Sequence, residues 1–320
     1  MRVATLYYEQ DYSQQQIADL LQISRSNISR LLKEAKQKGL VEIRVRKRVS
    51  TVAALEQTFC ERFGLQRAMI VESGDRTYAE QLATAGQLAA WYLEETLAPG
   101  NVLAISWGTG VSAAVTALAP SPTLMVDVVQ MIGSVGTVDS VIDGPELARQ
   151  LATKLGGQHY ALAAPLIVDS PTVRDLFLEQ PTIAETLQRS RRADVALLGI
   201  GTTAAEASSF LRAGHLTEAA LADLRAQGAV GESSGQHFDI HGCTDALAIN
   251  RRVIGLSLAE VKTIPTVVAV ACGLPKTRSI LGALRGGYLS ALATDDSTAR
   301  AVLAEADRTA DDQPRRSERM

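Results

Sequence analysis

Glycine and hydroxyl residues follow several predicted strands of this chain, in positions where they could bind an anion. The segments are Ser106–Gly110, Gly133–Thr137, Gly199–Thr203 and Gly273–Thr277. Backbone amides freed by glycine, a threonine hydroxyl and a helix N-terminus together form an anion-binding nest. Because the carboxyl ends of parallel strands share one edge of a sheet, these segments predict a common ligand site.

Lys276 could supply the cation of such a site. The other lysines beyond residue 50, Lys154 and Lys262, fall within or at the ends of helical patterns, whereas Lys276 follows Gly273 in a strand-to-helix loop. A cation in that position would complete a phosphate site. The alternative interpretation is a solvated loop lysine.

A second group of residues could bind DNA. Short polar and cationic side chains occupy the exposed positions of a predicted helix that begins after Ser24. Side chains of these types hydrogen-bond to base edges in the major groove or neutralise phosphates. The candidate DNA-binding residues are Arg25, Ser26, Asn27, Ser29, Arg30 and Lys33.

Other chemistry is weakly supported. His237, His241 and Cys243 lie close together, but no fourth ligand follows at a spacing typical of zinc, so no metal site is predicted. Asp239 and Asp245 in this segment are better suited to accept hydrogen bonds from sugar hydroxyls. No Ser-His-Asp arrangement, dinucleotide fingerprint or Walker lysine pattern is found, and no cofactor or catalytic residue is predicted.

The DNA-binding residues require a helix-turn-helix to position them. Ser13 with Gln16 forms a capping-box pattern, and Ser24 is a good N-cap for the second helix. Two apolar stripes are expected to face a small core, and Gly39 is expected to end the second helix. The stripes are Ile17, Leu20 and Leu21, then Ile28, Leu31, Leu32 and Ala35.

Residues 40–46 then alternate as in a strand, which predicts a wing. The first helix, over 1–9, is short for a winged domain. The alternative interpretation of the whole stretch is a helical hairpin with a solvated face.

Beyond Arg67 the pattern is that of a parallel α/β sheet with alternating strands and helices. We expect a DNA-binding domain over 1–50, a linker helix over 51–66, an effector and oligomerisation domain over 67–306, and a disordered tail over 307–320. Residues 232–244 are expected to be irregular. The expected strands are 68–71, 102–106, 126–132, 160–162, 195–198, 253–255, 266–271 and 289–293.

The balance of basic and acidic residues also differs between the DNA-binding part and the rest of the chain. Residues 1–50 contain ten Lys and Arg against five Asp and Glu, and the remainder contains 22 against 30. A basic first part on an acidic remainder indicates that only the first part touches nucleic acid. The cysteines are Cys60, Cys243 and Cys272, which predict no disulfide framework. With no apolar run long enough to span a bilayer, we expect a cytoplasmic protein.

Taken together, these motifs resemble the SorC/DeoR-type sugar-binding transcriptional regulators, and the resemblance covers nearly the whole chain. It is carried by the helix-turn-helix segment and by four segments of the remainder, 106–110, 252–256, 272–276 and 284–288, with Thr294–Asp296 closing the pattern. Two departures are the short first helix and Cys272, which stands where the family often has glycine.

The resemblance implies a fold similar to sugar-phosphate isomerases and deaminases, acting as a sensor without catalysis. Partners implied are double-stranded operator DNA, a phosphorylated sugar effector and further copies of the chain in a homotetramer, a dimer of dimers. Gly108, Thr109, Gly110 and Lys276 would hold the phosphate, and the residues around Gln130, Gly133 and Asp239 would face the sugar. With the glycine-rich strand ends, the predicted effector residues also include Gly199, Gly201 and Gly273.

The sequence therefore predicts a transcription factor with a winged helix-turn-helix and an α/β effector domain. One alternative is an isomerase-like or deaminase-like enzyme fused to a DNA-binding domain. A third interpretation, an architectural DNA-binding protein without an effector, leaves the glycine-rich strand ends unexplained.

Overall fold

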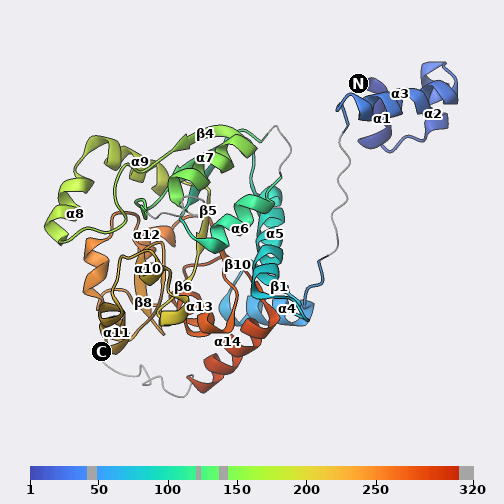
Figure 1. Cartoon of the computed structure of the whole chain (residues 1–320). Helices are drawn as coiled ribbons and strands as arrows, with labels where there is room; N and C mark the ends of the chain where they lie inside the picture. The colour runs from blue at the N-terminus through green and yellow to red at the C-terminus, as the bar shows by residue number, and fades with distance from the viewer. Residues whose placement is uncertain (42–48, 120–123, 137–142, 310–320) are drawn as a thin grey trace, which may run out of the picture. The chain divides into compact units, whose positions relative to one another are not determined.

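The computed structural model describes residues 1–41, 49–119, 124–136 and 143–309. The chain forms two compact units, Met1–Arg48 and Val49–Met320. Figure 1 shows the helices and strands of each unit. Among the described residues, no helix combines the length and the apolar character needed to cross a membrane.

The smaller unit is a three-helix helix-turn-helix with helices α1 (Arg2–Tyr8), α2 (Gln14–Leu21) and α3 (Arg25–Gln37). The predicted capping box is confirmed: Ser13 Oγ accepts from the Gln16 amide and Gln16 Oε1 accepts from the Ser13 amide. Ser24 Oγ accepts from the Asn27 amide at 3.2 Å, and Gly39 follows the end of α3 with φ +68°. These local bonds fix the helix ends as the sequence predicts.

The core of this unit differs from the predicted stripes at Leu20 and Leu31, which are 54 % and 37 % exposed. Ala18 is buried in α2 in place of Leu20, because the buried face of this helix consists of Ile17, Ala18 and the partly buried Leu21. The core residues of this unit are Leu6, Ile17, Ala18, Ile28 and Leu32. The predicted wing falls largely on residues 42–48, outside the described residues, and Leu40 and Val41 are not in a strand.

The larger unit is built on a parallel sheet with strand order β1-β10-β9-β5-β2-β3-β4. Strands β2, β3 and β4 follow one another in one direction, and β5 returns to the other side of β2. The strand order therefore reverses between β2 and β5, where open α/β sheets bind ligands. The strands are β1 (Arg67–Val71), β2 (Val102–Ile105), β3 (Val126–Gln130), β4 (Gly156–Tyr160), β5 (Val195–Gly199), β9 (Thr266–Val270) and β10 (Ala291–Asp295).

Helices cover both faces of this sheet (Figure 1). Leu103 and Ile105 of β2 pack in the cluster that contains α5, α6 and α7, whereas Ala104 faces the cluster that contains α4, α9, α13 and α14. Alternation with a period of two therefore divides the core between two layers. The helices are α4 (Ala53–Phe63), α5 (Tyr78–Thr96), α6 (Thr109–Ala117), α7 (Gly144–Leu155), α8 (Pro171–Leu178), α9 (Pro181–Arg191), α10 (Ser209–Arg212), α11 (Glu218–Ala226), α12 (Leu258–Val261), α13 (Thr277–Gly286) and α14 (Asp296–Arg308), with 3-10 turns η2 (Ala205–Ala207), η3 (Ala248–Arg252) and η4 (Leu274–Lys276).

The prediction that residues 232–244 are irregular is wrong in part, because the first half of this segment belongs to a hairpin. Strands β7 (Ala229–Ser233) and β8 (Gln236–Asp239) pair antiparallel, and β6 (Gly201–Thr202) joins them in a small second sheet. Ser234 and Gly235 form its two-residue turn, both with positive φ. Such turns match the twist of the flanking strands. The consecutive polar residues Glu232 and Ser233, and likewise Gln236 and His237, are buried, so no apolar alternation marks these strands.

Other boundaries shift. Residues 253–255 make only isolated bridges, β4 ends at Tyr160, and β10 begins at Ala291. The linker helix, α4, lies within the larger unit, where Phe59 is fully buried. Helix α14 extends past Ala306 into the expected tail, since Thr309 is held by the Arg285 guanidinium at 2.7 Å. Residues 310–320 lie outside the described residues.

Candidate functional site

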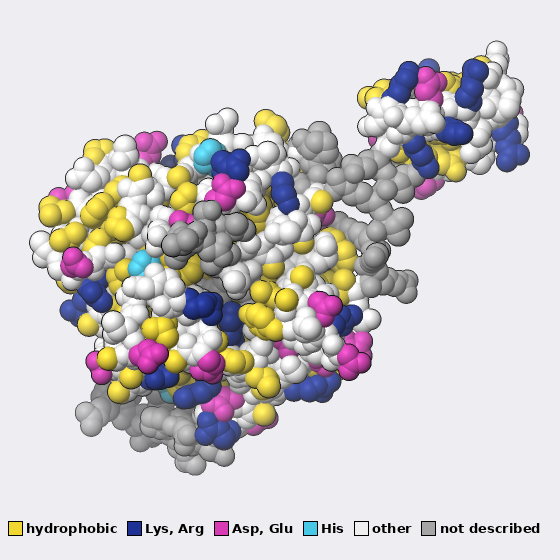
Figure 2. All heavy atoms as spheres, viewed as in Figure 1, with side chains coloured by type: hydrophobic (Ala, Val, Ile, Leu, Met, Phe, Trp, Pro, Cys, Tyr) yellow, Lys and Arg dark blue, Asp and Glu magenta, His cyan; other side chains and the backbone are white. Residues whose placement is uncertain are grey.

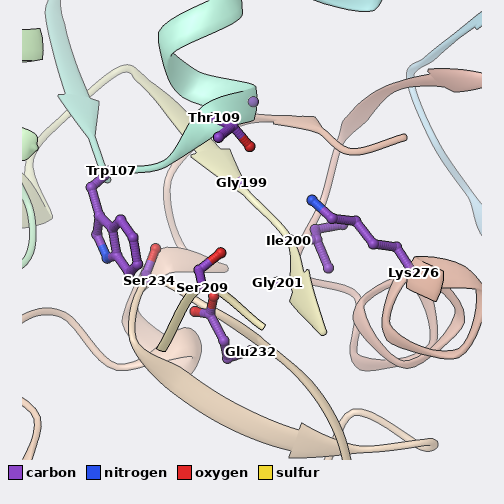
Figure 3. A pocket seen from close by; sticks show the side chains of 10 residues that line it. Trp107, Thr109, Gly199, Ile200, Gly201, Ser209, Glu232, Ser234 and Lys276 are labelled. Carbon is purple, nitrogen blue, oxygen red and sulfur yellow. The ribbon is translucent and has the colours of Figure 1, made fainter. Parts of the chain in front are cut away.

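A cavity lies beyond the carboxyl ends of β2, β5 and β9, which are neighbours in the sheet (Figure 3). The cavity is open to solvent, and about 320 Å³ of the space around its lining residues is not occupied by protein atoms. Five of the residues that line the cavity are among the effector-binding residues predicted from the sequence: Thr109, Gly110, Gly199, Gly201 and Lys276.

One wall of the cavity is the N-terminus of α6, which begins at Thr109. The amides of a first helical turn have no partner within the helix and favour negative charge. Gly108 precedes them with φ +112°, a conformation that favours glycine. A Cβ on Gly110 would lie 2.3 Å from the Val270 carbonyl oxygen. Glycine at this position therefore allows α6 to approach β9.

The opposite wall carries Lys276, whose side chain extends toward the cavity (Figure 3). Its backbone is fixed by a bond from its amide to the Gly273 carbonyl at 2.9 Å. Burial lowers the pKa of Lys276, while the nearby Cys272 and Glu232 act to raise it. A bound anion would stabilise the charged ammonium in the same way.

Glu232, Ser234, Ser209, Trp107 and Ile200 also line the cavity, and the sequence prediction missed them as ligand contacts. Burial raises the pKa of Glu232 to about 7, against a bond from the Gly235 amide and the charge of Lys276, both of which lower it. Ser234 Oγ is buried without a hydrogen-bond partner among the described residues. The cavity therefore offers polar groups of both kinds beside its cation.

Five of the predicted effector residues do not line this cavity: Gly108, Gln130, Gly133, Asp239 and Gly273. Gln130 is fully buried and accepts from the Leu162 amide. Gly133 is packed against the Pro165 carbonyl, which leaves no room for a Cβ. The Asp239 carboxylate accepts from the amides of His241 and Cys243 in its own loop. These contacts are structural, and sequence proximity to a strand end could not distinguish them. Gly108 lies between two lining residues.

The histidines of the hairpin segment do not form a metal site with other described residues. His237 is buried with its ring 4.9 Å from that of Phe210, and burial lowers its pKa to about 4. Within the described ranges, no group of three or more His, Cys, Asp or Glu residues is placed to hold a metal ion.

The candidate DNA-binding surface of the smaller unit is the outer face of α3. Residues Arg25, Ser26, Asn27, Ser29, Arg30 and Lys33 are all exposed. Ile28 and Leu32 face the core from the same helix. Lys and Arg side chains are visible on this unit in Figure 2. Glu34 pairs with Lys38 at 2.7 Å, on the later part of the helix. Apart from Leu31, the exposed side chains from Arg25 to Lys33 are polar or cationic.

Comparison with known proteins supports the same division. Residues 5–58 match the "Crp-like helix-turn-helix domain" family, and residues 47–304 match the "Putative sugar-binding domain" family. The molecule is thus a transcriptional regulator with a DNA-binding helix-turn-helix and a sugar-binding domain. The chain belongs to the SorC/DeoR-type family of sugar-binding transcriptional regulators.

Relatives match over nearly their full length. The deoxyribonucleoside regulator of Bacillus subtilis is 34 % identical over 303 residues, covering 95 % of this chain and 96 % of the relative. The sorbitol operon regulator of Klebsiella pneumoniae is 30 % identical over 305 residues, with coverage of 95 % and 96 %. The crystal structure of full-length SorC from Klebsiella pneumoniae has a TM-score of 0.73 at 30 % identity, covering 94 % of this chain and 97 % of that one.

Proposed function

We propose that this regulator binds a phosphorylated sugar in the cavity of the larger unit and that the sugar controls operator binding by α3. The observation that supports the phosphate is the convergence of Lys276 with Thr109 and Gly110 at the α6 N-terminus. A dianion there would receive a cation, a hydroxyl and free backbone amides. Glu232, Ser209 and Ser234 would then hydrogen-bond to sugar hydroxyls, with the Trp107 ring beside them.

The control of operator binding would be a shift between two arrangements of the protein. A ligand shifts such an equilibrium only as far as its affinities for the two arrangements differ. One helix-turn-helix covers few base pairs, so we propose that copies of the chain assemble, as a homotetramer, to contact repeated half-sites. Within this proposal residues 1–50 bind DNA and residues 67–306 bind the effector, and the linker helix of 51–66, α4, packs in the core of the larger unit.

A thermal-shift screen tests the ligand class. Glucose 6-phosphate, deoxyribose 5-phosphate and sorbitol 6-phosphate are compared with their unphosphorylated parents. A ligand that binds only the native state raises the melting temperature. At a hundredfold excess over its Kd, such a ligand adds about 2.7 kcal/mol to the free energy of unfolding. At least one phosphorylated member should raise it, and its parent should not. A shift by the parent sugars alone contradicts the proposal.

Lys276→Glu provides the matched variant. The carboxylate would repel the phosphate, so sugar-phosphate binding should fall more than a hundredfold, roughly 3 kcal/mol. Operator binding without ligand should persist. Lys262→Glu is the control, because Lys262 donates to the Gly286 carbonyl away from the cavity. Trp107 fluorescence reports binding once Trp91 is replaced by Phe, and native affinity in Lys276→Glu would overturn the assignment.

A further inference from the structure

Two adjacent carboxylates at the end of β10 hold two different loops. Asp295 accepts from the Gly273 amide at 2.9 Å, and Gly273 begins the loop that carries Lys276. Asp296 accepts from the Ser73 amide, also at 2.9 Å, in the loop that follows β1. The adjacent residues Asp295 and Asp296 therefore connect the loop that carries Lys276 to the loop after β1, which is an edge strand of the sheet.

The Asp295 end of this connection is firmly held. The carboxylate is fully buried and also accepts from the Thr298 amide at 2.9 Å and the Thr298 hydroxyl at 2.7 Å. Thr298 Oγ1 accepts in turn from the Gly273 amide at 2.9 Å. Gly273 has φ +98°, which a residue with a Cβ rarely adopts. A displacement of the Lys276 loop must therefore move the end of β10 or break these bonds.

Tyr78 links the same two regions a second time. Burial raises the pKa of Tyr78, and the Thr109 side chain, on the cavity wall, acts to lower it. The Tyr78 ring packs on Gly273, where an added Cβ would lie 3.2 Å from it. Tyr78 begins α5, directly after the loop that contains Ser73. Both walls of the anion site thus contact or join the loop after β1.

That loop lies beside the first residues of the larger unit. The Glu72 amide donates to the Ser50 carbonyl at 3.0 Å, and the Val52 amide donates to the Ile70 carbonyl at 3.0 Å. Thr51 and Val71 form an antiparallel bridge between them. The smaller unit ends at Arg48, so Ser50 to Val52 are the point where the chain from the DNA-binding unit is fixed to the sheet.

We propose that Asp296 is a positioning residue that couples the ligand cavity to the attachment point of the DNA-binding unit. This inference rests on the proposed function and specifies how its site is regulated. Closure of Lys276 on an anion displaces Gly273, Asp295 carries the displacement to Asp296, and the bond to Ser73 passes it to Glu72 and Ser50. Because Asp296 does not line the cavity and lies outside α3, we expect its loss to remove the coupling and to leave both binding events.

Coupling is measured as the ratio of sugar-phosphate Kd values with and without DNA. The probes are the sugar phosphates of the panel and a duplex selected from a random library by the unliganded protein. Thermodynamic linkage requires that the sugar phosphate changes the affinity for DNA by the same factor by which DNA changes the affinity for the sugar phosphate. Such factors are typically about 5–150-fold. We expect Asp296→Ala to bring this ratio below twofold while the separate affinities for sugar phosphate and duplex stay within about twofold of wild type.

Two variants separate coupling from folding. Asp296→Asn keeps an oxygen that can accept from Ser73 and should retain the wild-type ratio. Asp194→Ala removes a comparable carboxylate, which accepts from the Val102 amide at 2.8 Å at the start of β2, and should also retain it. A wild-type ratio in Asp296→Ala overturns the coupling role, and so does an equal loss in Asp194→Ala. Failure of the wild-type protein to bind any sugar phosphate instead contradicts the proposed function itself.

Discussion

The two candidate functional surfaces of this protein are built in opposite ways. The predicted DNA-binding residues lie within one helix, α3, and all are exposed. The cavity residues come from the ends of several strands and from a separate hairpin, and Glu232 among them is buried. One surface depends on local helix geometry, while the other depends on the approach of distant backbone segments. Substitutions should therefore act on the two surfaces by different physical routes.

The largest effect is expected where the cavity depends on close backbone approach. Gly110→Ala places a Cβ 2.3 Å from the Val270 carbonyl oxygen, which belongs to a central strand and cannot yield easily. We expect a loss of about 3 kcal/mol or more in the free energy of unfolding of the larger unit. Chemical denaturation followed by tryptophan fluorescence measures it, since Trp91 and Trp107 both lie in this unit.

Gly199→Ala is the control for this substitution. A Cβ at Gly199 would meet only the Trp107 carbonyl oxygen at 3.7 Å, an ordinary contact. Equal destabilisation by the two alanines would contradict the role of close approach.

A somewhat smaller effect, confined to one pH range, is expected at Glu232. Its pKa is raised to about 7, so its ionisation costs stability as pH rises from about 4.5 through 7. Glu232→Gln should gain on the order of 2–3 kcal/mol over wild type at pH 8.5 and little at pH 5. Denaturation at both pH values measures this difference. The exposed Glu206→Gln serves as control, and a gain independent of pH would refute the burial argument.

On the exposed surface of α3 the expected effect is on binding and leaves folding intact. Arg30→Ala should weaken operator binding by about 1–3 kcal/mol, because the guanidinium is solvent-exposed and free to meet DNA. Sugar-phosphate binding and the melting temperature should not change. Fluorescence anisotropy with a labelled duplex measures the affinity. Arg2→Ala, an exposed arginine of α1, is the control, and equal losses in both would contradict the proposed recognition role of α3.

The smallest effect is expected at the start of α3. Ser24→Ala removes the acceptor for the Asn27 amide and should cost about 1 kcal/mol of helix stability. Hydrogen exchange of the α3 amides should accelerate roughly fivefold, with the amides of the larger unit unchanged. Ser29→Ala, an exposed change in the interior of the same helix, should not produce this acceleration. An unaltered exchange pattern in Ser24→Ala would show that the cap contributes little.

The sequence by itself determined the features that depend on neighbouring residues. The capping box at Ser13, the N-cap at Ser24 and the end of α3 before Gly39 involve groups a few residues apart, so their residue types predict them. The alternation of strands and helices likewise predicts the parallel sheet. Because parallel strands place their carboxyl ends on one edge, Thr109, Gly110, Gly199, Gly201 and Lys276 could be assigned to one site from sequence.

Only the tertiary structure decided which of the remaining residues reach that site. Glu232 and Ser234 enter it through a hairpin whose buried polar residues give no apolar alternation. Asp239 sits at the other end of this hairpin, where its carboxylate is used by its own loop. Leu20 and Leu31 are exposed because the packing of α2 on α3, and not the spacing alone, selects the buried face. The same holds for Asp296, whose bond to Ser73 joins positions that are distant in the chain. Spacing along the chain determines local geometry, whereas contacts between distant segments depend on how the whole sheet and its layers pack.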